Sequence, residues 1–308
     1  MGKHAILIGA VVGLTCLWAA AAGVDESARA LAEASNARPS TRPARRVADF
    51  ASCSSLCQVR QPFEKAAQVI AGMGYRYVDL SCLHWPPSPP HANVAELMVD
   101  FEREASRIEK ILAANGLKVS NLTFDGLDAA NFDAYTQRFE TVMKLANRLN
   151  APLVNIMAPP NKADKQAMAD KLKVLQEIAA RHRVKLTLET HAGQLTEHPA
   201  DAVWLCKQVP GLGLTLDPSH YYAGPHQGGN FDEVYPFVMG TGLRAGGMNW
   251  ETVQLPWGEG PIDFAAIVRK LESQGYEGFY VAEYIDGFNK LDAVQESKKY
   301  LAWIKSLD

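Results

Sequence analysis

A regular alternation of short apolar stretches with longer amphipathic ones constrains the fold of this chain more than any other feature. The apolar stretches are rich in β-favouring residues and lie at 47–52, 76–81, 117–122, 152–157, 184–189, 212–217, 237–243 and 278–283. Helical patterns lie near 62–73, 94–115, 131–149, 164–182, 198–208, 229–236, 262–274 and 290–306. Strands that alternate with helices form parallel sheets. Eight such units predict an α/β fold of the (β/α)8 TIM barrel type, a parallel eight-stranded sheet closed on itself.

An open doubly wound sheet is the rival architecture. Its nucleotide-binding form carries a Gly-rich phosphate loop after a strand, and no such loop follows any of the apolar stretches. The helix ends fit alternating units, because Gly74, Gly116 and Gly275 each follow a helical pattern and precede a strand. Glycine adopts the left-handed conformation that ends many helices at little steric cost.

The N-terminal segment differs from the rest of the chain. Lys3 is followed by an uncharged run over 5–22 that ends in three alanines, which predicts a signal peptide at 1–22. Residues 23–46 are rich in Ala, Ser, Arg and Pro, which predicts a flexible linker before a barrel domain at 47–308. We therefore expect export to the periplasm or the cell exterior. An uncleaved membrane anchor is the alternative, since the apolar run is long for a signal.

The overall charge of the chain argues against nucleic acid as a partner. The 308 residues are 47% hydrophobic and 21% charged, with a formal net charge of −3 and no basic run in the barrel region. Binding to a phosphate backbone needs a Lys/Arg surface. A neutral or weakly charged small molecule, such as a sugar or polyol, suits this composition better. Nothing in the sequence specifies an oligomeric state.

Four cysteines follow the predicted signal peptide: Cys53, Cys57, Cys82 and Cys206. In an exported chain, Cys53 and Cys57 are close enough in sequence to form a disulfide if the segment between them turns. Free, partly buried thiols are the alternative, and both interpretations stay open.

Three carboxylates stand at the ends of predicted strands. Glu189, Asp217 and Glu283 each end a run of apolar residues, and a buried strand interior would not accommodate an unpaired charge. In a barrel, strand ends converge at one mouth, so these acids predict a site for a metal or a sugar. Oxygen ligands suit Mg²⁺ or Mn²⁺, and an added imidazole favours Mn²⁺, Co²⁺ or Zn²⁺. The alternative is that each acid forms a salt bridge with an arginine such as Arg244.

Histidines and an aromatic residue accompany these acids. His191 and His220 lie two and three residues after an acid, where each could bind a metal, bind substrate, move a proton or be purely structural. His84 follows the second strand, and Trp257 lies in the loop before the seventh helix. Both are candidates for lining a substrate pocket, although Trp257 could equally anchor its loop.

Several short motifs occur in an order typical of one family. They are Gly72-Met-Gly-Tyr-Arg-Tyr-Val-Asp79, Thr187-Leu-Glu189-Thr-His191-Ala-Gly193, Leu214-Thr-Leu-Asp217-Pro-Ser-His220-Tyr221, Trp257-Gly-Glu-Gly260-Pro-Ile-Asp263-Phe264 and Gly275-Tyr-Glu-Gly278-Phe-Tyr-Val-Ala-Glu283-Tyr284. With them, the chain resembles the sugar phosphate isomerase/epimerase family, the xylose-isomerase-like TIM barrels, over about residues 47–306.

The resemblance implies roles for the acids. In that family a Glu, an Asp, a His and a second Glu hold a divalent metal, and the two glutamates exchange a proton with a sugar carbon next to a carbonyl. Glu189, Asp217 and Glu283 match the first, second and last ligands, so Glu189 and Glu283 are the implied catalytic pair. His220 matches a histidine that contacts substrate near the metal.

The seventh strand departs from the family pattern. The metal-binding histidine belongs in a run resembling His-Leu-Arg-Asp, whereas this chain has Gly242-Leu243-Arg244-Ala245, and no histidine occurs after His226. Either His220 or water takes the missing ligand position, or metal binding is weakened. Arg244 is then a further candidate for contact with substrate.

These observations favour an exported, metal-dependent sugar isomerase or epimerase, with Mn²⁺ as the first choice of metal and Mg²⁺, Co²⁺ and Zn²⁺ as the others. The substrate-binding residues expected are His220, His191, His84, Trp257 and Arg244. The alternatives are a degenerate barrel that binds carbohydrate without catalysis, and a lyase-type enzyme on the same scaffold.

Overall fold

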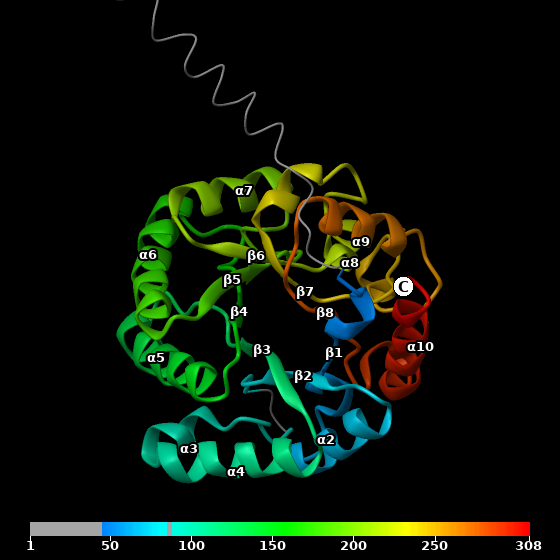
Figure 1. Ribbon diagram of the computed structural model, residues 1–308. Helices are drawn as coiled ribbons and strands as arrows, with labels where there is room; N and C mark the ends of the chain where they lie inside the picture. Colours follow the sequence, from blue (N-terminus) through cyan, green and yellow to red (C-terminus); the bar gives the residue numbers. More distant parts are fainter. Residues whose placement is uncertain (1–44, 85–87) are drawn as a thin grey trace, which may run out of the picture. The chain divides into compact units, whose positions relative to one another are not determined.

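Eight parallel strands form the centre of the protein, with helices outside them (Figure 1). The computed structural model describes residues 45–84 and 88–308, of which 46–308 form one unit. The strands are β1 (Ala51–Ser54), β2 (Tyr77–Ser81), β3 (Lys118–Phe124), β4 (Leu153–Met157), β5 (Lys185–Glu189), β6 (Gly213–Leu216), β7 (Val238–Thr241) and β8 (Tyr280–Ala282). Their order in the sheet is β7-β6-β5-β4-β3-β2-β1-β8.

The sheet closes between its two ends through Leu243, just beyond β7. Leu243 forms a parallel bridge with Ala282. Its backbone N–H donates to Val281 O at 2.7 Å, and its carbonyl accepts from Glu283 N at 3.0 Å. The predicted TIM barrel is therefore confirmed.

The helices that surround the barrel are α2 (Phe63–Gly72), α3 (Val94–Val99), α4 (Phe101–Ala114), α5 (Phe132–Arg148), α6 (Lys165–His182), α7 (Pro199–Gln208), α8 (Pro218–Ala223), α9 (Phe264–Ser273) and α10 (Ala293–Lys305). Short 3₁₀ helices are η1 (Val47–Phe50), η2 (Ser55–Gln58), η3 (Asp232–Phe237), η4 (Trp250–Thr252) and η5 (Phe288–Lys290). Gly74, Gly116 and Gly275 all have positive φ, as expected for residues that end helices.

Three predicted elements were wrong in detail. The first strand begins at Ala51 rather than at 47, because 47–50 form η1. The helix expected over 94–115 is divided at Asp100, whose side chain accepts from Arg103 N at 3.1 Å and begins α4. The helix expected over 229–236 is the 3₁₀ helix η3, which contains Pro236; proline disfavours an α-helical interior.

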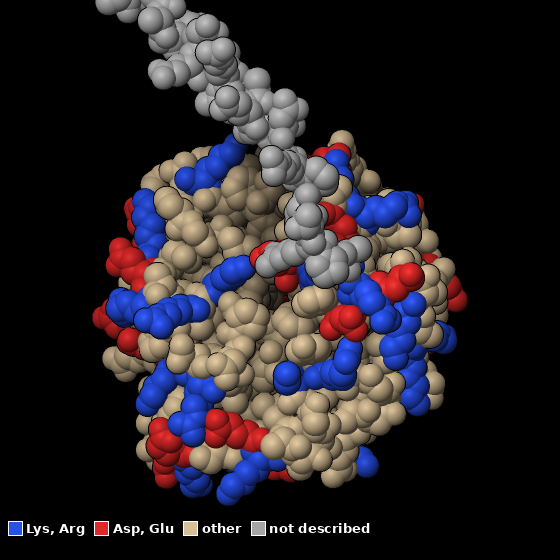
Figure 2. Space-filling model, viewed as in Figure 1, with Lys and Arg blue, Asp and Glu red and all other residues tan. Residues whose placement is uncertain are grey.

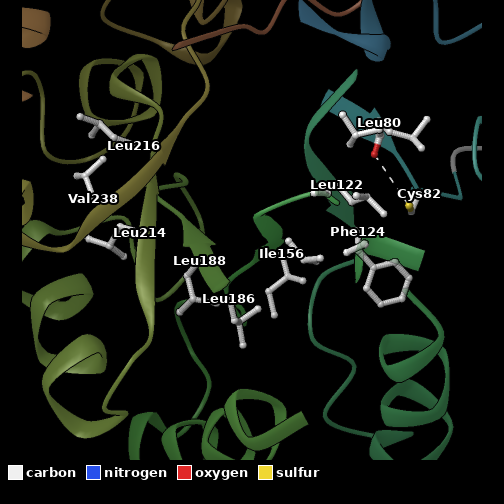
Figure 3. Close-up of a cluster of buried hydrophobic side chains, with 14 of the residues drawn as sticks. Leu80, Cys82, Leu122, Phe124, Ile156, Leu186, Leu188, Leu214, Leu216 and Val238 are labelled. Atoms are coloured by element: carbon white, nitrogen blue, oxygen red, sulfur yellow. Dashed lines mark hydrogen bonds between the residues drawn. The ribbon is translucent and has the colours of Figure 1, made fainter. Parts of the chain in front are cut away.

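Side chains of the strands alternate between two environments. Leu80, Leu122, Leu186, Leu188, Leu214 and Leu216 belong to the apolar layer between strands and helices (Figure 3). Successive strand residues point to opposite faces, so the residues between these leucines face the barrel axis. Several of them are polar, namely Asp79, Asn121, Thr123, Thr187, Glu189 and Thr215. The interior of this barrel therefore carries a polar, hydrogen-bonded lining below the strand ends.

The predicted signal peptide at 1–22, with its alternative as a membrane anchor, lies outside the described residues. So does the predicted linker at 23–46, apart from Arg45 and Arg46. Among the helices in the described part of the chain, none has the length and apolar character needed to cross a membrane. On the face drawn in Figure 2, basic and acidic side chains are interspersed around a hollowed centre.

Candidate functional site

Three buried carboxylates meet at the C-terminal ends of the strands. Glu189 is the last residue of β5, Asp217 follows β6 and Glu283 follows β8. Their exposed fractions are 5%, 0% and 9%. One oxygen of each lies within 4.8 Å of one oxygen of the others. The structure thus brings together the three acids that the sequence placed at strand ends, here called the acid cluster.

Local hydrogen bonds fix the position of Asp217. Its Oδ1 accepts from Ser219 N at 2.8 Å, which makes Asp217 the N-cap of α8, and Pro218 occupies the first turn. The Asp217 backbone N–H donates to Thr190 Oγ1 at 2.9 Å, and the Thr190 hydroxyl donates to Asp217 O at 3.1 Å. The turns after β5 and β6 are therefore tied to each other, which holds Glu189 and Asp217 side by side.

The buried guanidinium of Arg244 enters the acid cluster. Its Nη2 lies 2.7 Å from Asp217 Oδ2, and its Nη1 lies 3.8 Å from Glu283 Oε1. Arg244 also donates from Nε to Ser219 Oγ at 3.0 Å and from Nη2 to His220 Nε2 at 2.6 Å. Asp217 and Glu283 are therefore ion-paired with Arg244, as the salt-bridge alternative expected. The three acids nevertheless converge. Ser219 was not among the predicted site residues, because its hydroxyl is neither an acid nor a usual metal ligand. Only its place in the Asp217-Pro-Ser-His220 motif could have identified it.

Two histidines stack beside the acids. The ring centroids of His191 and His220 are 3.7 Å apart, and His220 Nε2 lies 3.6 Å from Glu189 Oε1 and 3.5 Å from Asp217 Oδ2. His191 Nδ1 donates to Ala192 O at 2.6 Å, which leaves its Nε2 without a proton. Burial lowers the pKa of His191 to about 4 and the pKa of His220 well below its ordinary value, so both rings are neutral at pH 7.

Burial has the opposite effect on the carboxyl groups. It raises the pKa of Glu189 to about 7, with a further increase from the neighbouring charge of Asp217 and an opposing effect of Arg244. Burial and the charge of Glu189 raise the pKa of Glu283 well above its usual range. Without an additional cation, this cluster therefore retains protons at neutral pH.

The donor atoms present fit a divalent cation. Asp217 Oδ2 is wholly buried, and despite the nearby Arg244 it has no aligned hydrogen-bond donor among the described residues. Glu189, Asp217 and Glu283 supply the hard oxygen ligands that Mg²⁺ and Mn²⁺ prefer. Glu189, His191 and His220 form a second, overlapping group whose ligand atoms also lie within 4.8 Å of one another. Either set would hold its metal at the end of β5.

Two predicted pocket residues make their contacts away from this cluster. The backbone N–H of His84 donates to Asp125 Oδ1 at 3.2 Å, and its side chain is exposed. Trp257 packs against Phe264, Tyr300 and Trp303, with ring centroids 4.7 to 5.0 Å apart. No contact joins either side chain to the acids in the described part of the chain. These aromatic contacts fit the alternative expected for Trp257, which is that it anchors its loop.

Trp250, in the loop between β7 and α9, lies over the histidine pair. Its ring centroid is 6.0 Å from that of His191 and 5.7 Å from that of His220, and 51% of the residue is exposed. It therefore covers the histidines with an aromatic side chain that remains open to solvent.

A polar network lies below the cluster, inside the barrel. Asp79 Oδ1 accepts from Asn121 Nδ2 at 2.8 Å and from Thr123 Oγ1 at 2.9 Å. Asn155 Nδ2 lies 3.5 Å from Glu189 Oε2, which links β4 to the acid cluster. Burial raises the pKa of Asp79 to about 7, so this network also carries a proton close to neutral pH.

The fold and the site define an α/β barrel with an acidic centre at the C-terminal ends of its strands. Residues 67–307 match the family described as xylose isomerase-like TIM barrel. The chain belongs to this family. No curated protein sequence matches it at a significant level.

Solved structures with the same fold include enzymes of different reaction types. The probable 3-DHS dehydratase AsbF of Bacillus anthracis aligns with a TM-score of 0.64 and 18% identity, covering 82% of this chain and 98% of its own. A xylose isomerase-like TIM barrel protein from Mycobacterium smegmatis in complex with magnesium aligns at 0.65 and 16%, covering 84% and 97%. D-psicose 3-epimerase of Clostridium cellulolyticum H10, with D-tagatose, aligns at 0.65 and 12%, covering 84% and 99%.

Proposed function

We propose that this protein is a divalent-metal-dependent isomerase or epimerase of a sugar or sugar derivative. The observation that carries the proposal is the convergence of Glu189, Asp217 and Glu283, with one oxygen of each within 4.8 Å of the others. Family membership and the epimerase among the structural neighbours support the same class of reaction. Mn²⁺ is our first choice of metal, because the site adds imidazoles to its carboxylates.

The two glutamates are suited to move a proton. With a pKa of about 7, Glu189 is partly ionised at neutral pH and accepts a proton from the carbon next to the carbonyl. Burial and the charge of Glu189 raise the pKa of Glu283 well above its usual range, which suits it to hold a proton and to donate it to the opposite face or to the adjacent carbon. A bound metal would polarise the carbonyl and lower the pKa values of its own ligands.

The other groups of the site orient substrate and limit water. His220 Nε2 lies 3.6 Å from Glu189 Oε1 and here accepts from Arg244 Nη2 at 2.6 Å, so it would bind a substrate hydroxyl beside Glu189 where that hydroxyl replaces the guanidinium. Trp250 offers an exposed aromatic surface to a sugar ring above the histidine pair. In this arrangement the guanidinium of Arg244 is engaged by Asp217, Ser219 and His220, so no substrate contact is assigned to it.

Proton exchange with solvent tests the proposal directly. Purified protein with Mn²⁺ is incubated with ketoses and aldoses in D₂O, and deuterium at the carbon next to the carbonyl is followed by NMR. Glu283→Gln is expected to lose about 10²–10⁴-fold in exchange rate, the usual contribution of a general acid–base group. Glu177→Gln, an exposed change on α6, is the matched control and should behave like wild type.

Two outcomes would redirect the assignment. A sugar that binds without exchange and without metal would favour a carbohydrate-binding barrel, for which the paired Arg244 and Asp217 are the supporting observation. Loss of water from the substrate would favour a lyase-type enzyme, since removal of a proton next to a carbonyl also begins a dehydration. The probable dehydratase among the structural neighbours supports this second candidate.

We further propose that the protein acts outside the cytoplasm. The proposal rests on the uncharged run over 5–22 and the small residues that end it. Cell fractionation with N-terminal sequencing of the mature protein tests it, and a cytoplasmic protein that retains Met1 would refute it.

A further inference from the structure

We propose that Arg244 is a resident cation of the acid cluster, and that a divalent metal binds there only when the guanidinium leaves Asp217. The inference rests on the proposed function to the extent that the metal concerned is the one proposed above. It adds a role for Arg244: this residue sets the metal affinity of the site.

Arg244 occupies the atoms that a metal would use. Its Nη2 lies 2.7 Å from Asp217 Oδ2 and donates to His220 Nε2 at 2.6 Å, so it engages the lone pair through which that imidazole would bind a metal. Its Nη1 lies 3.8 Å from Glu283 Oε1. Arginine remains charged in proteins, and a second cation at the same oxygens would be strongly repelled.

The arginine is held in place by contacts on several sides. Its Nε donates to Ser219 Oγ at 3.0 Å, on the same turn that positions Asp217. The residue is 4% exposed, so its charge is compensated by the carboxylates and by neutral acceptors rather than by water. This buried pairing makes departure from Asp217 a substantial part of the cost of binding a metal.

Gly242 allows Glu283 to take part in this pairing. A Cβ at position 242 would collide with Glu283 Oε2, so the carboxylate occupies the space that any larger residue there would fill. The other oxygen of Glu283 faces Arg244. Gly242 and Arg244, two residues apart after β7, thus produce one arrangement in which an internal guanidinium neutralises the acids.

Metal affinity provides the test, because it does not depend on turnover. The purified full chain is stripped with a chelator and titrated with Mn²⁺ by calorimetry at pH 7.5. Arg244→Met is expected to bind Mn²⁺ at least about tenfold more tightly than wild type, because the competing unit charge is gone. Arg181→Met, at an exposed arginine on α6, is the matched control and should leave the affinity unchanged. Equal or weaker binding by Arg244→Met would overturn the inference.

Two further measurements decide the question if Arg244→Met does not fold. Arg244→Gln also lacks the charge but keeps an amide donor within reach of Ser219, and it should show the same gain in affinity. A crystal structure of wild type with Mn²⁺ should show the metal on Asp217 and the guanidinium displaced from it. A metal bound at the cluster beside an intact Arg244–Asp217 pair would overturn the proposal. Tight Mn²⁺ binding by the variants without sugar turnover would support this inference and contradict only the proposed function.

Discussion

The carboxylate of Glu283 lies directly over the backbone of Gly242, in the space where a side chain at position 242 would otherwise be. The two residues belong to neighbouring segments, one just after β7 and one just after β8, joined by the Leu243 hydrogen bonds that close the barrel. A substitution that changes the size of residue 242 is therefore transmitted directly to one of the proposed catalytic groups.

Gly242→Ala should destabilise the protein. The added Cβ displaces Glu283 Oε2 inside a packed site, and such overpacking costs about 1–3 kcal/mol. Urea unfolding at pH 7 measures the change in the free energy of unfolding. Gly72→Ala, at the end of α2 where an added Cβ has nothing within 4 Å, is the control and should change the stability little. If Gly242→Ala is as stable as wild type, the Glu283 carboxylate moves aside freely.

Asp79→Asn should make the free energy of unfolding less sensitive to rising pH. Burial raises the pKa of Asp79 from 3.8 to about 7 in the folded state, so the folded protein holds this proton more tightly than the unfolded chain does. Stability from this group is therefore greatest below the unfolded pKa and is lost as pH rises from about 4 to about 7. Asparagine keeps the acceptor for Asn121 and Thr123 and has no charge to bury.

Urea unfolding of wild type and Asp79→Asn at pH 5 and pH 8 measures this effect. The free energy of unfolding of the variant, relative to that of wild type, should rise by about 1–3 kcal/mol between pH 5 and pH 8. The charge of Asp79 also raises the pKa values of Glu189 and Glu283, so the difference between the two proteins reports Asp79 together with its effect on these two carboxyl groups. Asp170→Asn, at an exposed position on α6, serves as the control. Parallel pH profiles for wild type and Asp79→Asn would show that Asp79 is ionised at little cost in the fold.

The barrel was predictable because periodicity is a local property of the sequence. Alternating apolar residues placed β5 at 184–189 and β6 at 212–217, within a residue of the observed bounds. The same reasoning placed Glu189 and Asp217 at strand ends, where a charge is tolerated. The first strand was misplaced because Val47–Phe50 has the apolar composition of a strand but adopts a 3₁₀ helix.

The internal arrangement of the site was less predictable, because it depends on which side chains meet across the barrel. From the sequence, Arg244 is predicted to be either a partner of the acids or a substrate contact, and only the structure shows it between Asp217 and His220. Trp257 likewise begins a loop motif, yet its ring packs in an aromatic group with residues of α9 and α10. Spacing along the chain carries no information about such distant neighbours.

The four cysteines of the barrel should be protected from thiol reagents in the native state. Cys53, Cys57, Cys82 and Cys206 are free and buried. A hydrogen bond with Cys53, together with burial, raises the pKa of Cys57, and burial raises the pKa of Cys206 to about 12. Because the thiolate is the reactive form, iodoacetamide at pH 7.5 should label these residues only after guanidinium is added.

Peptide mapping of the labelled protein also tests the predicted disulfide. The Sγ atoms of Cys53 and Cys57 lie 3.8 Å apart. Protein purified without reductant should carry both as thiols, as the structure has them. A peptide two mass units lighter that contains both, and that takes up label only after reduction, would establish the disulfide instead. Rapid native labelling of Cys82 or Cys206 would contradict their protection by burial.

Trp250→Ala should weaken binding of sugar and leave the fold intact. Its ring is half exposed and rests on His191 and His220, so its truncation removes aromatic surface above the site and opens no cavity in the core. We expect the free energy of unfolding to change by less than about 0.5 kcal/mol, as for other exposed positions. The KM for a sugar substrate should rise about tenfold, as for loss of an aromatic anchor.

Met248→Ala truncates another exposed apolar residue of the same loop and should leave KM unchanged. An equal rise in KM for both variants would attribute the effect to the loop as a whole, and no rise for Trp250→Ala would remove its ring from the substrate site.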